Sequence, residues 1–97
     1  MTEKNLIEYI REFSKPLKLR ENTIIGAEKL ANRTEEKFLN SGKKLQGTAA
    51  AIIYISGILN EDRRTQKELS KIANVPESTI RNRYLEIARS LDINKEK

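Results

Sequence analysis

The chain has 97 residues, with 19 Lys and Arg against 14 Asp and Glu, which gives a formal net charge of +5 and predicts one small basic domain. It contains no Cys or His, which excludes zinc and iron–sulfur sites, a thiol nucleophile, a histidine base and disulfides, so no metal or cofactor is expected. The longest apolar run, residues 49–55, is far shorter than the ~20 residues of a membrane span, and the N-terminus lacks a signal-peptide layout, so a soluble intracellular protein is expected.

Helices are predicted throughout, because no stretch alternates apolar and polar residues as a half-buried strand would. The first helix carries an apolar stripe over residues 6–13, with Thr2 as its N-cap. It is expected to end before Pro16, because the residue before a proline avoids the α region. The second helix carries its stripe over residues 24–38 and is expected to stop near residues 40–42, where Asn-Ser-Gly is a typical C-terminal signal.

The third segment, residues 45–59, is apolar or small on nearly every side. A helix of this kind is buried, so we expect it to be the central element around which the others pack. Its alanines at 49–51, with Gly47 and Gly57, would let neighbouring helices approach closely. A buried strand over residues 52–55 is the alternative, although the preceding alanine run favours helix.

The fourth and fifth predicted helices form a pair joined by a short turn. Thr65 and Glu68 have the spacing of a capping box, which opens the fourth helix. Asn74, which tolerates the left-handed conformation, ends it, and Pro76 suits the first position of the fifth helix. The residues expected to be buried on the two helices are Leu69, Ile72, Ala73, Ile80, Tyr84, Ile87, Ala88 and Leu91.

This pair matches the helix-turn-helix pattern over residues 66–85, with the small Ser70 in the first helix and the apolar Val75 after the turn. The residues that would project from its other side are Glu77, Ser78, Arg81, Asn82 and Leu85. Arg can hydrogen bond to guanine, Asn to adenine and Ser to either, so this face predicts binding in the major groove of DNA. The alternative is two antiparallel core helices with an ordinary polar face.

Several motifs resemble one known family. They are Gly42-Lys43, the Ala-Ala-Ala-Ile-Ile-Tyr-Ile-Ser run at 49–56, the Arg-Thr-Gln-Lys-Glu-Leu run at 64–69, Val75, and the Thr-Ile-Arg-Asn-Arg-Tyr run at 79–84. Together they are similar to the second cyclin-like repeat of transcription factor B, called TFIIB in eukaryotes and TFB in archaea, and the archaeal form fits better. The resemblance implies an all-α, five-helix cyclin-like domain over residues 1–97, with its helix-turn-helix at about 65–91.

The resemblance also implies a function. Members of the family carry an N-terminal zinc ribbon, a linker that reaches into RNA polymerase, and two five-helix repeats, so the chain is expected to be an excised, monomeric second repeat. This repeat would read the B recognition element upstream of the TATA box, on promoter double-stranded DNA bent by the TATA-binding protein. RNA polymerase would be contacted through the missing N-terminal parts. The expected location is the cytoplasm at the archaeal nucleoid, or the nucleus of a eukaryote.

Site residues are carried over position by position. The positions expected to contact bases are Ser78, Thr79, Arg81 and Asn82. Ser78 stands where the family often has Val, so no base preference is predicted. The positions chosen for phosphate contacts are Lys43, Lys44, Arg63, Arg64 and Arg83.

Most of these positions have a structural alternative. Lys43 and Lys44 could form a solvated turn, and Arg63 could pair with Asp62 or Glu61. The Thr79 hydroxyl could bond only within its helix. The stem of Arg83 could cover the core while its charge reaches a phosphate. Tyr54 and Tyr84 are expected to pack in the core rather than to stack on bases.

Three other functions are alternatives to DNA binding within an initiation factor. The first is a cyclin-like protein-interaction module that does not read DNA. The second, an autonomous helix-turn-helix repressor, would normally bring a dimerisation helix, and the chain shows no spare amphipathic segment for one. The third, an enzyme, is not expected, because carboxylates such as Glu35 and Glu36 lie on a polar helix face without a base or an apolar pocket.

Overall fold

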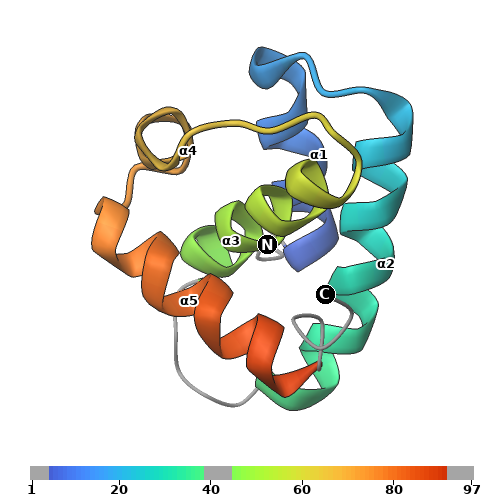
Figure 1. Ribbon diagram of the computed structural model, residues 1–97, viewed down its shortest axis with the longest axis vertical. Helices are drawn as coiled ribbons and strands as arrows, with labels where there is room; N and C mark the ends of the chain where they lie inside the picture. Colours follow the sequence, from blue (N-terminus) through green and yellow to red (C-terminus); the bar gives the residue numbers. More distant parts are fainter. Residues whose placement is uncertain (1–4, 39–44, 92–97) are drawn as a thin grey trace, which may run out of the picture.

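The computed structural model describes residues 5–38 and 45–91, and within these ranges the ordered elements are all helices. They are α1 (Leu6–Leu17), α2 (Glu21–Phe38), α3 (Leu45–Leu59), α4 (Gln66–Ala73) and α5 (Glu77–Ser90). The prediction of an all-α domain is confirmed, and the arrangement is consistent with a cyclin-like repeat (Figure 1). In the part of the chain that is described, none of the helices has the length and apolar character needed to cross a membrane.

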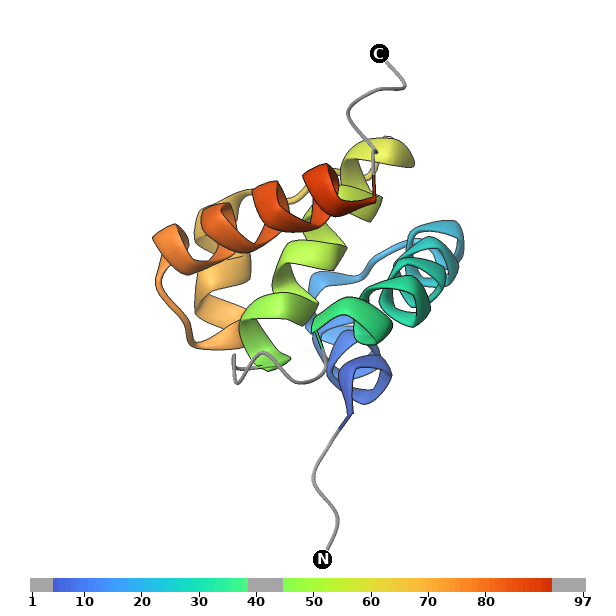
Figure 2. The ribbon, with the colours of Figure 1, turned by 90° about the horizontal axis from the view of Figure 1, so that it is seen from below.

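The central element is α3, as its composition predicts. Every residue from Gly47 to Gly57 is buried, and the helix packs against α1, α2, α4 and α5. Figures 1 and 2 show α1 and α2 on one side of α3 and α4 and α5 on the other. The alternative of a buried strand over residues 52–55 is wrong, because the whole segment is helical.

The ends of α1 differ from the prediction. Its N-cap is Asn5, whose side chain accepts a hydrogen bond from the Glu8 N–H at 2.9 Å, while the Glu8 carboxylate accepts from the Asn5 N–H at 2.8 Å. The predicted cap, Thr2, lies outside the described residues. At the other end, α1 continues through Pro16 to Leu17. Proline removes one backbone donor there, but the last turn is held because Leu17 is buried in the core. The predicted end of α2 near residues 40–42 also lies outside the described residues.

The connection between α3 and α4 is fixed by one buried carboxylate, that of Asp62, whose exposed fraction is 6%. It accepts hydrogen bonds from the backbone N–H of Arg20 at 2.9 Å, the hydroxyl of Thr23 at 2.8 Å and the guanidinium of Arg64 at 2.8 Å. The Arg64 guanidinium also donates to the carbonyl of Leu17 at 2.9 Å. These four residues, with Asp62, form what we call the Asp62 cluster. It joins the α1–α2 connection to the segment that leads into α4.

The Asp62 cluster should make stability depend on pH in the acid range. Burial alone would raise the pKa of Asp62, but hydrogen bonds from Arg20, Thr23 and Arg64 outweigh it and hold the pKa below its usual range. The ionised carboxylate therefore contributes stability above the unfolded-state pKa of about 3.9, and that contribution is lost as pH falls through the lower folded-state pKa. We expect urea denaturation from about pH 7 to about pH 2 to show this loss. Asp62→Asn should remove that part of the dependence, and an unchanged profile would contradict the assignment.

Candidate nucleic-acid interface

The helix-turn-helix begins with the predicted cap of α4. The Thr65 hydroxyl accepts from the Glu68 N–H at 3.0 Å, and the Glu68 carboxylate accepts from the Thr65 N–H at 2.9 Å. The helix ends at Asn74, whose φ of 59° is in the left-handed region. The capping box and the role of Asn74 are therefore confirmed.

After the turn that follows α4, helix α5 begins one residue later than predicted. Pro76 is the N-cap rather than the first helical residue, because its ψ of 151° keeps it extended. Its carbonyl accepts the N–H of Thr79 at 3.0 Å. The Ser70 hydroxyl donates to the carbonyl of Val75, so this small residue of α4 bonds directly to the turn.

Helix α5 packs on the rest of the domain through its buried face. Ile80 and Ile87 are completely buried and Leu91 is 9% exposed, as predicted. The rings of Tyr54 on α3 and Tyr84 on α5 have centroids 4.6 Å apart; as predicted they pack with the core, Tyr54 buried in it and Tyr84 partly buried against it. A hydrogen bond with Gln66 of α4 lowers the pKa of Tyr54 against the opposing effect of burial, while burial raises the pKa of Tyr84. The tyrosine pair therefore lies where α3, α4 and α5 meet.

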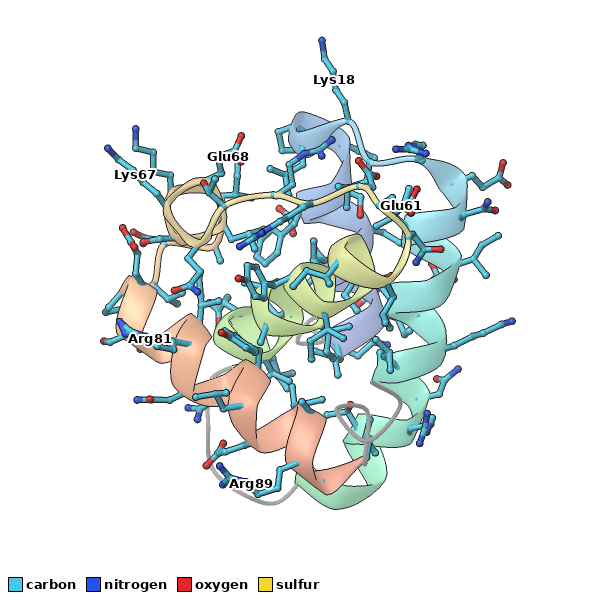
Figure 3. All side chains as sticks on the ribbon, viewed as in Figure 1. Lys18, Glu61, Lys67, Glu68, Arg81 and Arg89 are labelled. Carbon is cyan, nitrogen blue, oxygen red and sulfur yellow. The ribbon has the colours of Figure 1, made fainter. Side chains whose placement is uncertain are left out.

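The opposite face of α5 carries an exposed row, which we call the α5 stripe: Ser78, Arg81, Asn82 and Leu85. Their spacing of i, i+3, i+4 and i+7 places them on one side of a helix. Figure 3 shows Arg81 pointing outward from α5. Among the residues that the structure describes, none provides a hydrogen bond or ion pair for the side chains of Ser78, Arg81 or Asn82. The stripe therefore offers free donors and acceptors to a ligand.

Thr79 was predicted to contact a base, but it is half-buried between α3 and α5. A Cβ atom added at Gly47 of α3 would lie 3.0 Å from the Thr79 methyl carbon. Gly47 thus allows the close approach of the two helices that its sequence position suggested. The structure places Thr79 beside the stripe, and its base contact stays a prediction.

The two adjacent arginines chosen for phosphate contacts have different surroundings. Arg63 is exposed, its guanidinium carbon lies 6.0 Å from the Tyr54 ring centroid, and it makes a long 3.4 Å hydrogen bond to the Tyr54 hydroxyl. The ion pair to Asp62 that was considered for Arg63 is made by Arg64 instead. Because Arg64 is engaged in the Asp62 cluster, most of its donors face protein acceptors.

Arg83, another predicted phosphate contact, is less accessible. The Arg83 side chain is 16% exposed and pairs with Glu86 at 3.3 Å, while its buried Nε has no hydrogen-bond partner among the residues that the structure describes. Its stem does cover the core, as the sequence suggested. Lys43 and Lys44 lie outside the described residues. The structure therefore brings Arg63 and the α5 stripe to the surface, but not Arg64 and most of Arg83.

Sequence reasoning missed the contact between Arg63 and Tyr54 and the whole Asp62 cluster. Nothing local signals them, since Arg20 and Asp62 are 42 positions apart.

Comparison with known proteins gives matches over nearly the whole chain. Residues 1–90 match the family model described as "Transcription factor TFIIB repeat". The chain is similar to "Transcription initiation factor IIB" of Methanothermococcus thermolithotrophicus, with 43% identity over 93 residues, 96% of this chain and 27% of that protein. The factors of the same name from Methanosphaerula palustris and Methanopyrus kandleri are 45% and 42% identical over 90% and 89% of this chain, and 26% and 28% of their own lengths. The chain thus spans about a quarter of the length of these archaeal relatives.

Proposed function

Because the chain belongs to the TFIIB repeat family of transcription factors, we propose that it is a promoter-binding module of an archaeal-type initiation factor. In this proposal α5 enters the major groove upstream of the TATA box and reads the B recognition element. The TATA-binding protein bends the DNA and binds alongside, and the rest of the factor helps recruit RNA polymerase. The module itself has no catalytic role and acts at the chromosome. The observation that carries the proposal is the α5 stripe, an exposed helix face whose three polar side chains have no partner among residues 5–38 and 45–91.

The chemistry of the stripe supports base reading. Arg81 can donate two hydrogen bonds to guanine, and Asn82 can pair with the edge of adenine. Ser78 can serve a base or a phosphate, and the 39% exposed Leu85 offers an apolar surface to a thymine methyl group. For the phosphates we favour Arg63, because Tyr54 orients its guanidinium while the side chain stays exposed.

One recognition helix provides few contacts, each contributing about 1–3 kcal/mol. Binding by this chain alone is therefore proposed to be weak and sensitive to salt. The TATA-binding protein and the remainder of the factor would raise its effective concentration at the promoter, and specific binding would depend on them.

Arg81→Ala should weaken binding by about 1–3 kcal/mol, or about 5- to 150-fold, because a bidentate base contact is lost. Selectivity should relax at one base pair of the upstream element. Fluorescence anisotropy with labelled duplexes, each changed at one base pair and with the TATA-binding protein present, measures both effects.

The matched control is Arg89→Ala, which removes the same charge from the same helix about 12 Å further along. It should leave selectivity unchanged. An equal loss for Arg81→Ala on every duplex would make Arg81 a phosphate contact. If no duplex shifted the α5 amide resonances at low salt, the protein-interaction alternative would be correct.

A further inference from the structure

An open groove of about 460 Å³ lies at the C-terminal end of α1, where the chain turns into α2. Its lining residues are Arg11, Ser14, Lys15, Lys18, Leu19 and Ile24. Figure 3 shows Lys18 extending from the end of α1, away from Arg81 on α5. The groove is therefore separate from the α5 stripe.

The rim of the groove is positively charged. Arg11 and Lys15 are four residues apart, which places them on one side of α1, and Lys18 follows at the C-terminal cap of the helix, where it lines the same groove. Arg11 is compensated by Glu28, whose carboxylate lies 2.8 Å from its Nε. Lys15 and Lys18 are exposed, and neither forms an ion pair within residues 5–38 and 45–91. Within the described residues, the groove is thus lined by two uncompensated cations.

The floor of the groove is apolar. Leu19 is 8% exposed, and Ile24 is partly buried against the core. The hydroxyl of Ser14 is already used, because it donates to the carbonyl of Ile10 at 2.6 Å. The floor therefore presents apolar surface rather than a free hydrogen-bond donor. An apolar side chain fits it better than a nucleic-acid backbone does.

From this combination we propose that the groove binds an acidic segment of a partner protein. Carboxylates of the segment pair with Lys15 and Lys18, and an apolar side chain between them rests on Leu19 and Ile24. Because this surface is distinct from the α5 stripe, one module can hold DNA and a protein segment at the same time. The proposal does not depend on the proposed function of α5.

Lys18 supplies a variant that separates binding from folding. It has a φ of 54° at the end of α1, a left-handed conformation that glycine adopts at lower cost than any other residue. Lys18→Gly therefore removes the charge without harming the fold, and its unfolding midpoint in urea should equal or exceed that of the parent. Combined with Lys15→Gln, it removes both uncompensated cations.

The test is a titration of the ¹⁵N-labelled 97-residue chain with a short peptide in which Asp and Glu flank a central Leu-Phe pair. We expect the amide shifts to be confined to the groove-lining residues. The Lys15→Gln, Lys18→Gly variant should bind about tenfold more weakly, as the loss of two exposed ion pairs allows. Lys67 is exposed on α4, so Lys67→Gln is the matched control for the loss of charge and should bind the peptide like the parent.

Three results would overturn the proposal. The first is the absence of shifts at millimolar peptide. The second is equal binding of a peptide whose Leu-Phe pair is replaced by Ser-Ser, which would show a site for any polyanion. The third is duplex DNA shifting the Lys15 and Lys18 resonances in competition with the peptide, which would make the groove part of the DNA interface.

Discussion

Replacing Asp62 by alanine should lower the free energy of unfolding by about 3–5 kcal/mol, because it leaves a buried ion pair without its acid. Three donors would lose their acceptor at once: the backbone N–H of Arg20, the Thr23 hydroxyl and the Arg64 guanidinium. Orphaned buried donors cost more than the hydrogen bonds themselves contribute. Urea denaturation followed by circular dichroism measures the loss.

A domain of this size has a total stability of only about 5–15 kcal/mol, so Asp62→Ala can fail to fold. Asp62→Asn is the second variant, since an amide oxygen still accepts and only the charge is lost. Glu28→Gln is the control, because it breaks an ion pair in which the Arg11 side chain is 63% exposed. Because that pair is exposed to solvent, it should contribute little to stability. An equal decrease in the free energy of unfolding for Asp62→Asn and Glu28→Gln would show that the buried Asp62 cluster stabilises the fold no more than an exposed ion pair does.

Ile80→Ala should cost about 2–5 kcal/mol, because the side chain is completely buried and its removal leaves a cavity under the start of α5. The comparison is Leu85→Ala on the same helix, where the side chain is 39% exposed and the expected loss is below about 0.5 kcal/mol. Both are measured by denaturation at neutral pH. A similar decrease in the free energy of unfolding for the two variants would mean that α5 does not pack on the domain through the face that carries Ile80.

The pair Arg63 and Arg64 illustrates where sequence reasoning ends. The two are neighbours of the same type, and both were chosen for phosphate contacts. In the structure Arg63 stays exposed beside Tyr54, while Arg64 donates to Leu17 and Asp62. No local property distinguishes them, because the difference arises from acceptors that α1 and the α3–α4 connection bring to one of the two.

The end of α3 gives a second example. Gly57 was expected to allow a neighbouring helix to approach. Instead, the close neighbour is the chain's own connection: a Cβ atom at Gly57 would lie 2.8 Å from the backbone carbonyl oxygen of Asp62. The prediction of close packing was correct, but its partner could be identified only from the folded chain.

The sequence by itself determined the helices, the cap at Thr65, the left-handed Asn74 and the exposed side of α5, because periodicity and capping act over a few residues. Tertiary structure alone decided which polar groups are engaged. The Asp62 cluster joins residues 39 to 47 positions apart, and the groove at the end of α1 is lined by Ile24 of α2 together with Lys15 and Lys18. Such contacts depend on how the helices pack around α3, and no short stretch of sequence carries that information.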